Sequence, residues 1–191
     1  MKLVEPTTEY DQQICAYRKE FLDCGDSMDG TGALRRMDNP QVWIEHANRC
    51  KDPLTVPQGL VPATQYMLVR EEDQKIVGMI QIRHFFNPYL EKYGGHIGYS
   101  IRPTERGKGY NNINLYLGLK VCDANGIDTV FMDADLDNPA SWKTMEKFGG
   151  VRIREYFDDV EAQCMVVDYN IDVRKALADH PEYEDLIVPQ K

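Results

Sequence analysis

The sequence lacks the marks of several large protein classes. Its five cysteines (Cys15, Cys24, Cys50, Cys122 and Cys164) include no C-x-x-C pair, which argues against a disulfide framework or a structural zinc site and favours a reducing cytoplasm. Polar residues interrupt every apolar stretch well short of the ~18 residues that a membrane span needs. The first residues form no basic, apolar signal region, so we expect neither membrane insertion nor Sec-type secretion.

Basic residues are few compared with acidic ones. The chain of 191 residues has 22 Lys and Arg against 31 Asp and Glu, which gives a formal net charge of −9. An acidic protein repels phosphate backbones, so we expect no nucleic-acid partner. Cationic small molecules or basic peptides are the more natural partners of such a surface.

The sequence offers no convincing metal site. Its four histidines are far apart, and isolated histidines are more often packing or surface residues than ligands. Asp133, Asp135 and Asp137 have the spacing of a calcium-loop start, but the sixth and twelfth positions of that loop hold Asn138 and Thr144 instead of Gly and Glu. We therefore expect no metal.

Hydrophobic periodicity and turn signals predict an α/β domain with a mixed sheet. Helices are expected after the capping residues Thr7 and Thr8, after Asn39, and over 109–124 and 139–148; the expected strands are 65–69, 75–83, 96–102, 127–132, 151–157 and 164–171. This order predicts a sheet that is mostly antiparallel and locally parallel where a helix crosses over. We expect one domain over 1–174 and a C-terminal extension over 175–191.

The most informative segment is 99–110, where a strand runs through Pro103 into a glycine-rich turn and a helix. Gly107 and Gly109 let backbone N–H groups approach a ligand, and the helix N-terminus adds partial positive charge, so the turn is a candidate anion site. Arg106 and Lys108 add full charges. The simpler alternative is a turn that needs glycine and carries two solvated cations. The spacing fits neither a Walker A loop nor a dinucleotide fingerprint.

Two segments of the chain resemble the GNAT acyltransferase superfamily. Ile101-Arg102-Pro103 followed by Arg106 to Asn111 is similar to the V-x-P step and Q/R-x-x-G-x-G/A loop of that superfamily, and 138–150 is similar to its N-x-x-S-x-x-x-Y-E-K-x-G-F segment. The resemblance implies the GNAT fold, a mostly antiparallel mixed sheet flanked by helices, over about 1–171. Asn111 departs from the usual Gly or Ala, and Met145 stands where the superfamily often has a tyrosine.

The resemblance also implies a function. It predicts an acetyl-CoA-dependent N-acetyltransferase, in which a primary amine of a small molecule or peptide attacks the acetyl group directly through a tetrahedral intermediate. The implied coenzyme-binding residues are Ile101, Arg102, Pro103, Arg106, Gly107, Lys108, Gly109, Tyr110, Asn111, Asn138 and Ser141. The alternative is a non-catalytic acyl-CoA-binding module on the same fold, because Met145 cannot protonate the leaving thiolate; Tyr110 or a water could do so, or the thiolate could leave unprotonated.

The general base is the least defined part of this hypothesis. His96 is the first candidate, since it begins a strand from which several superfamily members project a base and its ordinary pKa suits proton removal near neutrality. His84, Asp133, Asp135 and a water chain are alternatives. We expect residues 24–63 to shape the pocket for the acceptor amine, and we expect that amine to be cationic. The resemblance is also compatible with a homodimer.

Overall fold

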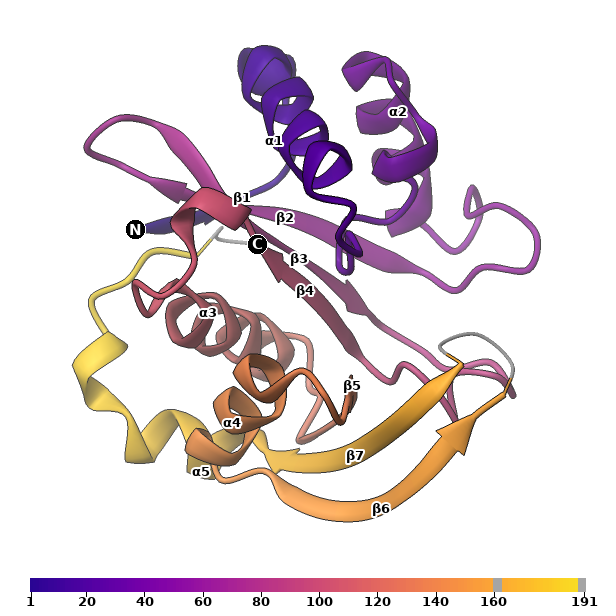
Figure 1. Cartoon of the computed structure of the whole chain (residues 1–191), viewed down its shortest axis with the longest axis vertical. Coiled ribbons are helices and arrows are strands. Elements are labelled where there is room, and N and C mark those ends of the chain that lie inside the picture. The colour runs from indigo at the N-terminus through magenta and orange to yellow at the C-terminus, as the bar shows by residue number, and fades with distance from the viewer. Residues whose placement is uncertain (160–162, 189–191) are drawn as a thin grey trace.

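The computed structural model describes residues 1–159 and 163–188 (Figure 1). Its strands and helices follow the order β1 (Lys2–Val4), α1 (Asp11–Cys24), α2 (Pro40–Lys51), β2 (Ala63–Arg70), β3 (Lys75–Arg83), β4 (Ile97–Ile101), α3 (Tyr110–Ala124), β5 (Thr129–Asp135), α4 (Pro139–Lys147), β6 (Val151–Asp158), β7 (Cys164–Asp172) and α5 (Val173–Asp179). Short 3-10 turns precede α1 and α3, at Thr8–Tyr10 and Pro103–Glu105. The predicted mixed α/β fold is confirmed.

The strands form two antiparallel sheets. The first has the order β1-β2-β3-β4 and the second the order β5-β7-β6. The sheets meet where the His96 N–H donates to the Phe131 carbonyl at 2.7 Å, and beyond this junction no ladder joins β4 to β5 in the described part of the chain. Every ladder between the named strands of the described chain is antiparallel, so the parallel pairing predicted at the helical crossover is absent as a ladder. The sheet is instead split between β4 and β5, which opens a cleft between them.

Helices cover both faces of the first sheet (Figure 1). On one face, Tyr17 and Phe21 of α1 and Trp43 of α2 pack against Met67 and Met79 in one buried cluster. On the other face, a larger buried cluster joins α3 and α4 to both sheets. No helix in the described ranges is long and apolar enough to cross a membrane.

Most predicted elements are present, with differences at their ends. Helix α1 begins at Asp11, because the segment after Thr7 first makes a 3-10 turn. Ile14, Tyr17 and Phe21 are the buried residues of α1. Leu22, which was expected on the same face, is 38% exposed, since a helix turns about 100° between Phe21 and Leu22. Helix α2 begins as expected, with the Asn39 side chain accepting hydrogen bonds from the N–H groups of Gln41 and Val42.

The C-terminal segment packs on the same core as the rest of the chain. Val173 and Ala176 of α5 are buried, and the ring of Tyr183 lies 5.3 Å from that of Tyr116. Residues 189–191 of the expected extension lie outside the described residues, as do residues 160–162 between β6 and β7. The division at residue 174 stays a prediction.

Candidate active site

A cleft of about 1120 Å³ lies where β4 and β5 diverge. Alternation along the strands divides it into two sides. Tyr99 and Met132 face α3 and α4, with the Met132 side chain in the larger core cluster. Ser100 and Asp133 face the opposite way, towards α1 and the chain around Gly94. The cleft therefore has two differently built sides.

We name the two sides by their residues. The glycine-loop side consists of Gly107, Gly109, Tyr110, Asn111, Tyr99, Asn138 and Ser141. The aspartate side consists of Asp26, Asp29, Asp133, Asp135 and Asp158.

The glycine loop presents backbone N–H groups to the cleft. Gly107 and Gly109 have φ of +73° and +79°, and a Cβ added at either would meet nothing within 4 Å, so this surface is open. Gly109 is the N-cap of the 15-residue helix α3 and no side chain caps that end. Among the described residues, none of the N–H groups of 107–111 donates to a protein acceptor. Such a row at a helix N-terminus fits a diphosphate.

The edge of β4 offers further N–H groups. The Arg102 N–H bonds to the Val77 carbonyl of β3 at 2.9 Å, and backbone groups of alternate residues point to the same edge of a strand. The N–H groups of Tyr99 and Ile101 therefore point away from β3, into the cleft. They are suitably placed to donate to an extended ligand or to a developing oxyanion.

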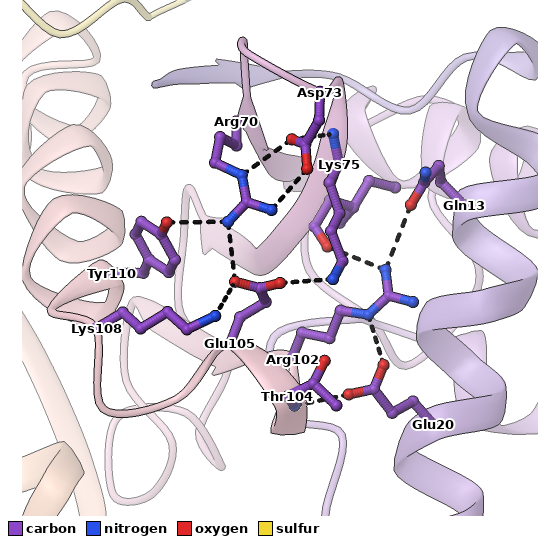
Figure 2. A network of polar contacts seen from close by, with 11 residues as sticks. Gln13, Glu20, Arg70, Asp73, Lys75, Arg102, Thr104, Glu105, Lys108 and Tyr110 are labelled. Carbon is purple, nitrogen blue, oxygen red and sulfur yellow. Dashed lines mark hydrogen bonds and ion pairs between the residues drawn. The ribbon is translucent and has the colours of Figure 1, made fainter.

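The buried carboxylate of Glu105 pairs with three cations beside the glycine loop (Figure 2). Glu105 is 3% exposed and pairs with Lys75, Lys108 and Arg70 at 2.5, 2.9 and 3.0 Å. Burial alone would raise the pKa of Glu105, but these three cations hold that pKa at about 2. Lys108 is turned towards Glu105 and does not line the cleft.

Arg102 and Pro103 also lie outside the cleft lining. The Arg102 side chain is 8% exposed and its Nε donates to Glu20 of α1 at 2.6 Å (Figure 2). Pro103 begins the 3-10 turn that leads to Glu105. The structure therefore places Arg102, Pro103 and Lys108 behind the loop, and it brings Ile101, Arg106, Gly107, Gly109, Tyr110, Asn111, Asn138 and Ser141 together in the cleft.

Asn111 joins the two helices that border the glycine-loop side. Its Nδ2 donates to Thr144 Oγ1 at 3.0 Å and to the Ala140 carbonyl at 3.3 Å. The amide side chain is thus directed at α4, and it ties the first turn of α3 to that helix. Asn111, which stands where the superfamily usually has Gly or Ala, therefore connects α3 to α4.

Two hydroxyl groups meet on the same side of the cleft. Tyr99 Oη and Ser141 Oγ are 2.9 Å apart, and burial raises the pKa of Tyr99. Met145 is 0% exposed and belongs to the core cluster. A tyrosine there would enter packed core, so the hydroxyls of Tyr99 and Ser141, and not position 145, are available to a leaving group.

His96 lies at the junction of the two sheets and does not line the cleft. Its backbone N–H donates to the Phe131 carbonyl, and its Nδ1 accepts the Phe131 N–H at 3.0 Å. The ring lies 4.1 Å from that of Phe86. Burial lowers the pKa of His96 to about 4, so the imidazole is a weak base. It joins β4 to β5 at the point where they begin to diverge.

The aspartate side concentrates negative charge. Burial raises the pKa of Asp133, although a 2.8 Å hydrogen bond from the Gly94 N–H opposes this effect. Burial also raises the pKa of Asp135, and the charges of Asp29, Asp137 and Asp158 raise it further. Because their pKa values are raised, the charged forms of Asp133 and Asp135 would be stabilised by a nearby cation.

Residues from the first third of the chain complete this side, and the sequence did not predict them individually. Asp26 and Asp29 belong to the loop after α1, which lies directly on β4: a Cβ on Gly30 would come within 2.2 Å of the Gly98 carbonyl oxygen. Ser100 Oγ donates to the Asp29 carbonyl at 2.6 Å. The sequence predicted only that residues 24–63 as a whole shape the acceptor pocket. Among the described residues no group of His, Cys, Asp or Glu is arranged to hold a metal ion.

Comparison with known proteins defines the class to which this fold and cleft belong. The model of the acetyltransferase (GNAT) family matches residues 32–150, more than half of the chain. The chain belongs to the GNAT acetyltransferase family. No curated protein sequence matches it.

Solved structures agree on the fold. The ribosomal-protein-S5-alanine acetyltransferase of Vibrio fischeri is 15% identical with a TM-score of 0.66, over 89% of this chain and 92% of that one. A point mutant of the spermidine N-acetyltransferase of Vibrio cholerae is 11% identical with a TM-score of 0.65, over 94% and 99%. An N-acetyltransferase of Staphylococcus aureus is 16% identical with a TM-score of 0.64, over 90% and 97%. At such identities the likeness shows the fold alone.

Proposed function

We propose that this protein is an N-acetyltransferase that transfers the acetyl group of acetyl-CoA to a primary amine of a cationic small molecule or peptide. One observation carries the proposal. An uncapped helix N-terminus with unpaired N–H groups opens onto the same cleft as a group of carboxylates. The first suits the diphosphate of a coenzyme, and the second suits an ammonium group.

The donor binds along the glycine-loop side. The N–H groups of 107–111 hold the diphosphate, and Arg106 adds a charge-assisted contact. Asn138 and Ser141 lie beside the pantetheine arm. The N–H of Tyr99 or Ile101 donates to the thioester carbonyl oxygen and stabilises its negative charge during attack.

Asp133 is the group that accepts the proton of the incoming amine. It lines the cleft, whereas His96 is held at the sheet junction with its Nδ1 occupied. The raised pKa of Asp133 makes its carboxylate a better base than an ordinary aspartate. The amine nitrogen forms a bond to the acetyl carbon, the carbon–sulfur bond breaks, and the Tyr99–Ser141 pair supplies a proton to the thiolate. The pair regains a proton from solvent, and Asp133 releases the proton of the amine to solvent.

The compartment proposed for this activity is the cytoplasm. All five cysteines are free thiols, which supports a reducing environment. A homodimer stays a prediction.

Calorimetric titration of the purified protein with acetyl-CoA, with desulpho-CoA as a nucleotide control, tests the donor site. A thiol-release assay with a panel of cationic, neutral and anionic amines then tests transfer. We expect micromolar binding of both coenzymes and turnover with cationic amines. Binding without turnover on any amine would support the alternative of a non-catalytic acyl-CoA-binding module, and no binding of either coenzyme would overturn both.

A further inference from the structure

The side chain of Arg106 is not directed at the open N–H groups of the glycine loop. Its Nη1 donates to Asp26 Oδ2 at 2.6 Å and its Nε donates to the Ile101 carbonyl at 3.2 Å. Its guanidinium lies 5.6 Å from the centre of the Phe21 ring. The charge that would meet a diphosphate is therefore paired with a carboxylate.

Asp26 comes from the other side of the cleft. It follows Gly25, which ends α1 in a left-handed conformation with φ of +70°, and its backbone carbonyl accepts a hydrogen bond from Arg35. Both Asp26 and Arg106 line the cleft. We call the loop after α1, which carries Asp26 and Asp29, the acceptor loop. The ion pair thus bridges the acceptor loop and the glycine loop.

We infer that Asp26 is a specificity-determining residue that Arg106 masks until the donor binds. A diphosphate at the glycine loop competes with Asp26 for Arg106. Once Arg106 turns to the diphosphate, the Asp26 carboxylate is unpaired on the aspartate side and adds one negative charge to the place where a cationic acceptor enters. This inference rests on the proposed function, since it needs the donor at the glycine loop.

The exposure of the pair makes this exchange feasible. The side chains of Arg106 and Asp26 are 50% and 37% exposed, and partly exposed ion pairs change an equilibrium by about fivefold or less. A diphosphate held by several N–H groups is a stronger partner for a guanidinium than one such carboxylate. Because coupling between two ligands is reciprocal, a bound cationic acceptor then also favours donor binding.

Asp26→Asn tests the inference, because it keeps the shape of the side chain and removes the charge. We expect this variant to bind desulpho-CoA about two- to fivefold more tightly than the wild type. In the presence of Arg106→Ala, which itself weakens binding, the gain from Asp26→Asn should vanish. The KM of a cationic acceptor should rise in Asp26→Asn with kcat nearly unchanged.

Two further variants separate the ion pair from general effects of charge and folding. Asp137→Asn removes an equal charge from the same cleft and should leave coenzyme affinity within about 1.5-fold of the wild type. Asp26→Glu keeps the charge and should bind desulpho-CoA as the wild type does. Circular dichroism confirms that each variant is folded.

Other results would overturn the inference. Unchanged or weaker coenzyme binding by Asp26→Asn would show that the ion pair only holds the acceptor loop in place. An equal gain from Asp137→Asn would show a general charge effect. A wild type that binds no coenzyme would instead overturn the proposed function, so the two failures are distinguishable.

Discussion

The two sides of the cleft are built in opposite ways. The glycine-loop side is drawn mainly from two continuous segments, 101–111 and 138–144, and it presents the open backbone N–H groups of 107–111 to the cleft. The aspartate side collects residues from three distant parts of the chain, around positions 26–29, 133–135 and 158, and it presents side-chain carboxylates to the cleft. A substitution leaves the backbone N–H group of a residue in place, whereas a single substitution removes a side-chain carboxylate. The first arrangement suits a constant ligand, and the second suits a ligand that differs between relatives.

Asp133→Asn should have the largest effect and should break only the aspartate side. We expect kcat/KM to fall by about 10²–10³-fold, the size of a general-base contribution, while the Kd of acetyl-CoA stays unchanged. The low-pH fall in wild-type activity, as Asp133 is protonated, should be absent from the variant. Equal losses in activity and in coenzyme affinity would contradict the division into two sides.

Protein stability provides a control for this variant. Burial raises the pKa of Asp133 above its ordinary value of 3.8, so its contribution to stability is fully present below that ordinary value and is lost as the pH rises through the raised pKa. At pH 7 the asparagine removes an unfavourable charge and still accepts the Gly94 N–H. The melting temperature should therefore stay the same or rise.

Gly109→Ala should break only the glycine-loop side. An alanine at φ of +79° is strained by about 1–2 kcal/mol, and relief of that strain tilts the N–H groups away from the diphosphate. We expect the Kd of acetyl-CoA to rise about tenfold, as for the loss of one hydrogen bond to a charged group. Isothermal calorimetry measures it.

Gly126→Ala is the matched control for Gly109→Ala. Gly126 follows the other end of α3 with φ of +75°, and a Cβ there also meets nothing within 4 Å. The two variants should lose similar stability, and only Gly109→Ala should lose coenzyme affinity. Similar losses of affinity in both would show that strain, and not the loop, is responsible.

Ser141→Ala should have a smaller effect, because Tyr99 keeps the second hydroxyl of the pair. We expect kcat to fall about tenfold with little change in coenzyme affinity. Tyr99→Phe should act similarly, and the double variant should lose less than the product of the two single losses if the hydroxyls act together. A pre-steady-state assay of thiol release distinguishes this step from acceptor binding.

His96→Gln should have the smallest kinetic effect, less than about threefold in kcat, if His96 joins the sheets and is not the base. The folded-state pKa of about 4 lies below the ordinary value of 6.5, so the contribution of the imidazole to stability is present above pH 6.5 and is lost as the pH falls towards 4. Acid unfolding of the wild type should steepen in this window, and the variant should lack that slope. A loss of kcat by 10²-fold or more would restore His96 as the base.

The same contrast explains what the sequence could predict. Residues 101–111 and 138–150 are continuous, so their pattern predicted a strand, an open loop and two helices, all of which are present. Partners far apart in the chain escaped prediction. Glu105 is held by Arg70 and Lys75, which lie 35 and 30 positions away. Arg106 pairs with Asp26, which lies 80 positions away. The sequence predicts His96 as the first candidate for the base, and only the hydrogen bonds with Phe131, 35 positions away, show that the half-buried His96 joins the two sheets.

The contact of Gly30 with Gly98 has a consequence for evolution and for protein engineering. Backbone rests on backbone there, so the loop after α1 is fixed to β4 at a point that no side chain defines. Neighbouring positions 26, 27 and 29 face the cleft and can change without moving that contact. A loop grafted from a relative should keep its contact with β4 if it retains a glycine at position 30. Under the proposed function, variants that accept other amines could then be selected without changes to the glycine-loop side.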